Sequence, residues 1–203
     1  MDNTSSRRDE LRAKYSRYRH WEIFKILETD LAKVSRYISI SGDNFKTHSA
    51  ELSSLILHIC TEIEILRKRM TGASDNGSAA RELFKMYPDV ADYDVELPLW
   101  SLVFQPWKSL PSSKPDWWLA YEQIKHDHAG AVAAGNLENF LSALSGLYVL
   151  TLYYDRFVYS EDAHGGEYVI TELTVDSAYF INRNEDPKSR ARRGRLWKAN
   201  QGE

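Results

Sequence analysis

Cysteine is almost absent from this sequence of 203 residues. The single Cys60 excludes a disulfide framework within one chain and a zinc site built from cysteines, which is typical of a reducing compartment such as the bacterial cytoplasm. Its apolar neighbours Ile59 and Ile63 favour a buried thiol over a reactive one.

Long apolar segments are missing as well. The first twenty residues, MDNTSSRRDELRAKYSRYRH, lack the apolar core of a secretory signal. The longest uncharged run, Asn139 to Tyr154, contains several polar side chains and falls short of the roughly 20 apolar residues that a spanning helix needs. We therefore expect a buried core helix there and a cytoplasmic protein.

The usual cofactor and catalytic motifs are also lacking. There is no glycine-rich phosphate loop, no Gly-x-Ser-x-Gly elbow and no zinc-protease helix, so we expect neither cofactor nor metal. The formal net charge of -3 excludes a polycation that coats nucleic acid. Any contact with nucleic acid must come from a local patch.

Apolar residues recur at steps of three and four in three segments, which is the pattern of amphipathic helices. The first helix is expected at about 19–40, the second over the stripe from Leu52 to Leu66 and on to "RKRM", and the last from an N-cap at Asn136 to about Ser160. The sequence therefore predicts an all-α, up-and-down bundle of four to five helices.

The middle of the chain is less regular. Four prolines interrupt residues 81–111, which predicts a short helix near 80–87 followed by an ordered loop. The aromatic side chains of this loop, which include Trp100, Phe104 and Trp107, are expected to pack against the bundle. A further helix should start at "SSKPDWW", with Ser113 as its cap.

Three parts are expected: a flexible basic arm over 1–18, the bundle over 19–160 and a C-terminal extension over 161–203. In the extension, "EYVITELTV" and "AYFIN" could form a short β-hairpin. The basic tail that follows is either solvated or a contact for RNA or a partner protein. Its candidate contact residues are Lys188, Arg190, Arg192, Arg193, Arg195, Trp197 and Lys198.

The octapeptide "YEQIKHDH", residues 121–128, combines histidine, lysine and tyrosine. On a helix, Tyr121 and His128 share one face, Lys125 lies beside Tyr121, and His126 lies on another face. His126 or His128 could transfer a proton in RNA cleavage, Lys125 could stabilise a phosphate, and Tyr121 could position the substrate.

A purely structural role of the octapeptide is the favoured alternative. His128 would then pack on Trp117, and His126 would pair with Glu122 at the surface. His126 and His128, next to Asp127, are suitable ligand types, but the sequence fixes no third partner for a metal site. On the second helix, Glu62 and Glu64 are expected at a solvated edge, paired with Arg67 or Lys68.

Several segments of the chain resemble bacterial HEPN-like proteins (higher eukaryotes and prokaryotes nucleotide-binding). They are "LETDLAKVSRYISISGDNFKTHSAELSSLIL", "TEIEILRK" and "WWLAYEQIKHDH", followed by "GNLENFLSALSGLYVL", within about residues 21–157. The most specific part is Trp-x-x-Tyr-x-x-x-Lys-His. The family's catalytic signature, an Arg followed after four to six residues by His, is absent, and Tyr121 stands five residues before His126.

The resemblance implies a helical bundle that often dimerises and acts in phage-defence or toxin-antitoxin systems. It leaves two functional hypotheses. One is a non-catalytic module that binds RNA or a partner protein. The other is a metal-independent ribonuclease that uses Lys125, His126 and His128 in a dimer cleft, with His126 as the counterpart of the family histidine.

Overall fold

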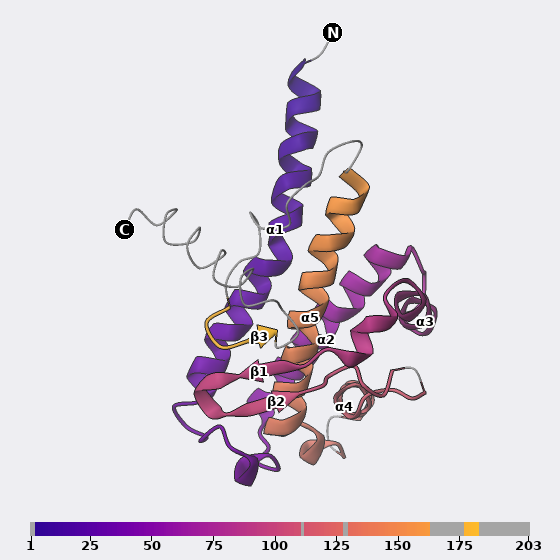
Figure 1. The fold of residues 1–203 in the computed structure, drawn as a ribbon. Helices are drawn as coiled ribbons and strands as arrows, with labels where there is room; N and C mark the ends of the chain where they lie inside the picture. The colour runs from indigo at the N-terminus through magenta and orange to yellow at the C-terminus, as the bar shows by residue number, and fades with distance from the viewer. Residues whose placement is uncertain (1–2, 111, 128–129, 163–176, 183–203) are drawn as a thin grey trace.

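Five α-helices form the described part of the protein, which confirms the predicted all-α bundle (Figure 1). The computed structural model describes residues 3–110, 112–127, 130–162 and 177–182, with the backbone alone for 3–18, 155–162 and 182. The helices are α1 (Asn3–Val34), α2 (Ala50–Thr71), α3 (Asn76–Met86), α4 (Asp116–His126) and α5 (Leu137–Asp162). Short 3-10 turns are η1 (Gly42–Asn44), η2 (Pro88–Asp92), η3 (Pro98–Trp100) and η4 (Val132–Ala134).

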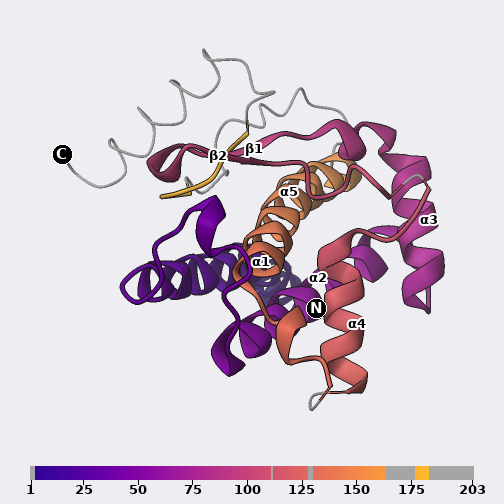
Figure 2. The ribbon, with the colours of Figure 1, turned by 90° about the horizontal axis from the view of Figure 1, so that it is seen from below.

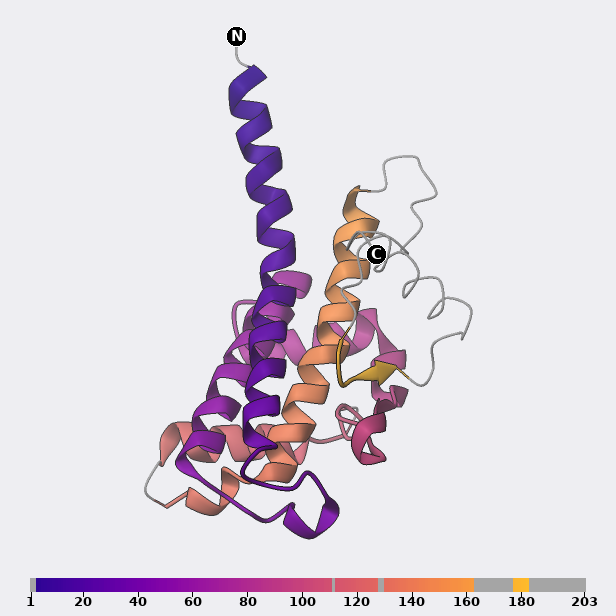
Figure 3. The ribbon, with the colours of Figure 1, turned by 90° about the vertical axis from the view of Figure 1, so that its left-hand side faces the viewer.

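Helix α5 lies at the centre of the bundle. It packs against α1, α2 and α4, and Figure 3 shows α1, α2 and α5 side by side. The side chains of Phe140, Leu144 and Leu147 are at most 1% exposed, as expected for a core helix. Helix α1 begins at Asn3 without a break at the predicted arm boundary, and its first half projects beyond the other helices (Figures 1 and 3).

The helix ends follow local capping chemistry with one exception. Ser49 accepts a hydrogen bond from the Leu52 N–H at the start of α2, and Gly72, at φ 68°, ends that helix in the left-handed conformation that glycine adopts easily. Asn136 caps α5, as predicted, by accepting from the Asn139 N–H at 3.0 Å. The predicted cap of α4 at Ser113 is wrong: α4 starts directly after Pro115 and has no side-chain cap.

A small antiparallel sheet covers one side of the bundle (Figure 2). Its strands are β1 (Val95–Leu97), β2 (Leu102–Phe104) and β3 (Ile181–Asn182), in the order β2-β1-β3. Val95 pairs with Phe104 on one side of β1, and Glu96 pairs with Ile181 on the other. The predicted aromatic loop thus contains a hairpin, and the "AYFIN" segment adds a strand to it. The "EYVITELTV" segment lies outside the described residues.

Residues 177–182 dock on the bundle through two side chains. Phe180 is 2% exposed and packs on the rings of Phe24 and Tyr148. The buried carboxylate of Glu28 accepts hydrogen bonds from the Ser177 hydroxyl and from the Tyr179 N–H at 3.1 Å. Part of the C-terminal extension therefore belongs to the core.

Candidate functional site

Helix α4 carries residues 121–126 of the octapeptide. Trp117, Tyr121 and Ile124 are at most 4% exposed and form its buried face. The helix ends at His126, and the following Asp127 has an extended φ of -145°. His128 lies outside the described residues.

Lys125 contacts the side chains of Tyr121 and Glu64. Its ammonium donates to the Tyr121 hydroxyl at 3.1 Å and lies 3.8 Å from a Glu64 carboxylate oxygen. The hydrogen bond with Tyr121 raises the pKa of Lys125, and burial raises the pKa of the Tyr121 hydroxyl. Tyr121 and Lys125 thus come together as predicted, in a contact that a neighbouring carboxylate partly neutralises.

His126 stands apart from this contact. Its side chain is exposed, and among the described residues it has no hydrogen-bond or ion-pair partner. The expected pairing with Glu122 is wrong, because Glu122 pairs with Lys114 at 2.5 Å. The seven candidate contact residues of the basic tail, Lys188 to Lys198, lie outside the described residues. Among the described residues, His126 has no hydrogen-bond partner in common with Lys125.

The carboxylates of α2 correct another expectation. Glu62 is 9% exposed and lies 3.4 Å from the buried His20 rather than at a solvated edge, and Glu64 pairs with Lys125. The Arg69 guanidinium lies 3.1 Å from His20 Nε2. Burial, with Arg69 and Arg19 nearby, lowers the pKa of His20 to about 4, and burial raises the pKa of Glu62. These groups form a buried polar contact between α1 and α2.

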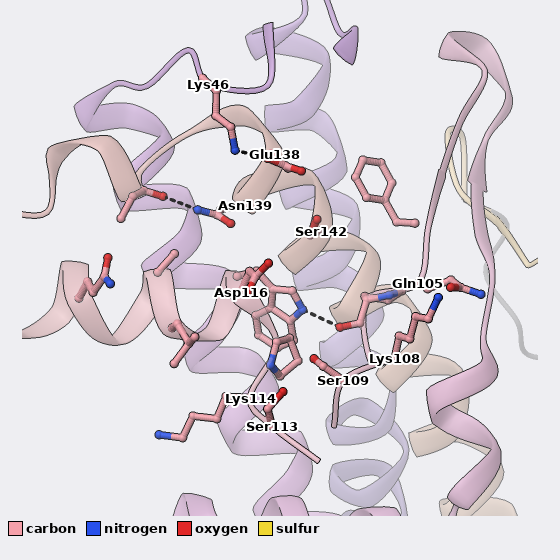
Figure 4. A pocket seen from close by; sticks show the side chains of 18 residues that line it. Lys46, Gln105, Lys108, Ser109, Ser113, Lys114, Asp116, Glu138, Asn139 and Ser142 are labelled. Carbon is pink, nitrogen blue, oxygen red and sulfur yellow. Dashed lines mark hydrogen bonds and ion pairs between the residues drawn. The ribbon is translucent and has the colours of Figure 1, made fainter. Parts of the chain in front are cut away.

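A groove of about 550 Å³ opens at the other end of α4 (Figure 4). Its walls come from four separate segments of the chain: Lys46, residues 104–109, the start of α4 with the residues before it, and residues 134–142. We call it the Trp117 groove. In Figure 4 the carboxylate of Asp116 is drawn between the Lys46–Glu138 pair and the two serines Ser109 and Ser113. This volume is typical of small-ligand and peptide pockets, which span about 300–1,000 Å³.

Charges of both signs line the Trp117 groove. Lys46 pairs with Glu138 at 2.7 Å, and this hydrogen bond raises the pKa of Lys46. Lys114 pairs with Glu122, whereas Lys108 has no ion pair among the described residues. The lining also contains neutral donors and acceptors, namely Gln105, Ser109, Ser113, Gln123, Asn139 and Ser142. Three lysines against two carboxylates leave a surplus of one positive charge.

Two tryptophans set the shape of the Trp117 groove. Trp107, fully buried, donates its indole N–H to the Gly146 carbonyl at 3.1 Å, and Trp117 donates to the Pro106 carbonyl at 2.7 Å. Their rings meet edge to face with centroids 5.0 Å apart. A Cβ at Gly146 would lie 3.4 Å from Trp117 and 3.6 Å from Trp107, which is ordinary van der Waals contact, so this packing does not depend on a glycine. The aromatic loop is thereby fastened to α5.

The ionisable side chains that line the groove are lysines and carboxylates. No histidine or cysteine is among the residues that line it. In the parts of the chain that the structure describes, no group of three or more His, Cys, Asp or Glu side chains could hold a metal ion. Burial raises the pKa of the Cys60 thiol, consistent with the unreactive cysteine that was predicted.

Sequence reasoning missed the groove because its residues are far apart in the chain and individually ordinary. The aromatic loop was the available signal, since it predicted that Phe104 and Trp107 pack on the bundle. Nothing in the pattern indicated that Lys46 and Asn139 would face the same space.

Comparisons of the chain with protein-family models, with curated proteins and with solved structures give no significant match. None of the described helices combines the length and the apolar character needed to cross a membrane.

Proposed function

We propose that this protein is a non-catalytic, HEPN-like binding module whose Trp117 groove takes up an extended segment of a partner protein. The observation that carries the proposal is the lining of the groove, which is rich in neutral donors and acceptors and contains no histidine or cysteine. A bacterial phage-defence or toxin-antitoxin setting is part of the proposal and rests on the sequence resemblance.

The side chains of the groove suit a polypeptide. Backbone N–H and C=O groups need both acceptors and donors, which Gln105, Gln123 and Asn139 supply. Leu119 is 43% exposed and offers an apolar contact for a side chain of the segment. The carboxylates of Asp116 and Glu138 disfavour RNA, because they repel phosphates and leave the groove with a surplus of only one positive charge.

The ribonuclease alternative remains a prediction. It requires a second chain to bring together groups that one chain keeps apart, since Lys125 contacts Tyr121 and Glu64 while His126 points into solvent alone among the described residues.

A peptide-display library selected on the purified protein tests the proposal. We expect enriched peptides to lose binding to Leu119→Glu, which places a charge in the groove, and to retain binding to Ile26→Glu, a matched change at an exposed apolar residue of α1. Peptides that bind both variants equally, or no enrichment at all, would contradict it.

A parallel assay with labelled RNA and a chelator tests the alternative directly. Cleavage that disappears in His126→Ala would replace the binding module with a metal-independent ribonuclease. RNA left intact by both proteins is the expected result.

A further inference from the structure

A second cavity, of about 500 Å³, lies between α3 and the segment that leads into α4. Both helices are on the same side of the bundle (Figures 1 and 2). Its floor is apolar and consists of Ala80, Phe84, Leu110 and Trp118, and its rim carries Arg81, Lys85 and Lys114. We call it the α3–α4 cavity. It is distinct from the Trp117 groove, although Ser113 and Lys114 line both.

The rim of the α3–α4 cavity is cationic. None of the described residues that line it carries a carboxylate. The carboxylates of Glu82 and Glu122 pair with Lys85 and Lys114, but at exposed positions, where an ion pair contributes little and is easily exchanged. Arg81 donates to the neutral Ser78 hydroxyl at 3.2 Å and has no ion pair among the described residues, while the nearby Asp75 carboxylate offsets part of its charge.

A buried arginine, Arg67, packs on Trp118, which lines this cavity. The guanidinium of Arg67 is centred 3.8 Å from the Trp118 ring, and the residue is 1% exposed. Two of its nitrogens, Nε and Nη1, lack a hydrogen-bond partner in the described structure. Salt and water screen a buried charge less than an exposed one, so Arg67 adds positive potential on this side of the protein, partly offset by Glu64.

We propose that the α3–α4 cavity binds a small aromatic anion. The flat apolar body of the ligand lies on Trp118 and Phe84, and its carboxylate, sulfonate or phosphate group lies at Arg81. Three features that arise independently support this assignment: an aromatic floor, a rim without lining carboxylates, and an incompletely hydrogen-bonded arginine behind Trp118. This inference goes beyond the proposed function and does not depend on it.

Fluorescence titration with 1-anilinonaphthalene-8-sulfonate tests the inference, because this dye joins an aromatic body to one negative charge. We expect Arg81→Glu and Phe84→Ala each to weaken dye binding by about tenfold or more, which corresponds to about 1.4 kcal/mol. Two matched charge reversals at exposed positions outside the cavity, Lys108→Glu and Arg36→Glu, should leave it unchanged. Near-UV circular dichroism confirms that each variant is folded.

A neutral analogue of the dye, N-phenyl-1-naphthylamine, tests the aromatic contact separately from the ionic contact with Arg81. It should bind wild type and Arg81→Glu equally and should bind Phe84→Ala more weakly. Dye binding that Arg81→Glu leaves intact, or that Lys108→Glu weakens to the same degree, would overturn the proposal. So would a melting temperature that the dye raises equally in wild type and Arg81→Glu.

Discussion

The two ends of helix α4 differ in almost every respect. At its C-terminal end, Lys125 and His126 are exposed, and their only described contacts are those of Lys125 with Tyr121 and Glu64. At its N-terminal end, Trp117 and Trp118 are buried and form walls of two concave surfaces. His126 lies at the C-terminal end, whereas the residues that line the two cavities at the N-terminal end include cationic side chains and carboxylates but no histidine.

This difference shows what decides where a ligand can bind. A histidine and a lysine near a helix end are common at surfaces and acquire a role only when other elements enclose them. Enclosure at the N-terminal end comes from the aromatic loop, which the indole hydrogen bonds of Trp107 and Trp117 fasten in place. We therefore expect substitutions at the two ends to have very different effects.

Trp107→Ala removes the anchor of the aromatic loop next to the N-terminal end of α4 and should have the largest effect on stability. Trp107 is fully buried, so truncation leaves a large cavity and removes the hydrogen bond to Gly146, and we expect a loss of about 3–5 kcal/mol in the free energy of unfolding. Urea denaturation measures it. Trp107→Phe keeps most of the ring and should lose on the order of 1–2 kcal/mol. A loss below about 1 kcal/mol in Trp107→Ala would mean that the loop does not depend on this anchor.

The buried His20 makes the free energy of unfolding depend on pH. The pKa of His20 is lowered from 6.5 to about 4 by burial and by Arg69 and Arg19. Between these two pH values the unfolded chain binds a proton at His20, whereas the folded protein does not. The free energy of unfolding should therefore fall as the pH falls from 6.5 toward about 4. The loss is on the order of 2–3 kcal/mol at about 1.4 kcal/mol per pKa unit.

Glu62 works against this loss in the lower part of the pH range. Its raised pKa makes the folded protein take up a proton above the ordinary value of 4.5, while the exposed His58 and the arginines act in the opposite direction. Denaturation of His20→Gln across the same pH range should give a flatter profile than that of wild type. An unchanged slope in His20→Gln would exclude His20 as the source.

Arg67→Met tests the buried cation behind Trp118 and should have a small effect. The guanidinium stacks on Trp118 but leaves two buried nitrogens unpaired, so a side chain of similar volume without charge should leave the free energy of unfolding unchanged or raise it by about 1 kcal/mol. Arg67→Ala, which opens a cavity, should lower it by about 2–3 kcal/mol. Thermal denaturation of both variants measures the difference. A loss in Arg67→Met as large as in Arg67→Ala would show that the charge itself stabilises the fold.

Much of the fold was predictable because it depends on local spacing. The apolar stripe from Leu52 to Leu66, the cap at Asn136 and the buried face of α4 all follow from residues within a few turns of one another. The His20–Glu62 contact was not predictable, because it depends on how α1 and α2 are aligned. The same holds for the docking of Phe180 on Phe24 and for both cavities, whose walls come from distant segments.

His126→Ala should have the smallest effect of all. The side chain is exposed and has no partner among the described residues, so we expect a change of less than about 0.5 kcal/mol in the free energy of unfolding and unchanged binding of groove-selected peptides. Lys125→Ala removes the contact with Tyr121 one turn away and should lose about 0.5 kcal/mol at most. Denaturation together with peptide titration of both variants measures this. A substantial loss of peptide binding in either variant would move the functional site to the C-terminal end of α4 and reverse the comparison, because the residue types there would then matter more than the enclosure at the other end.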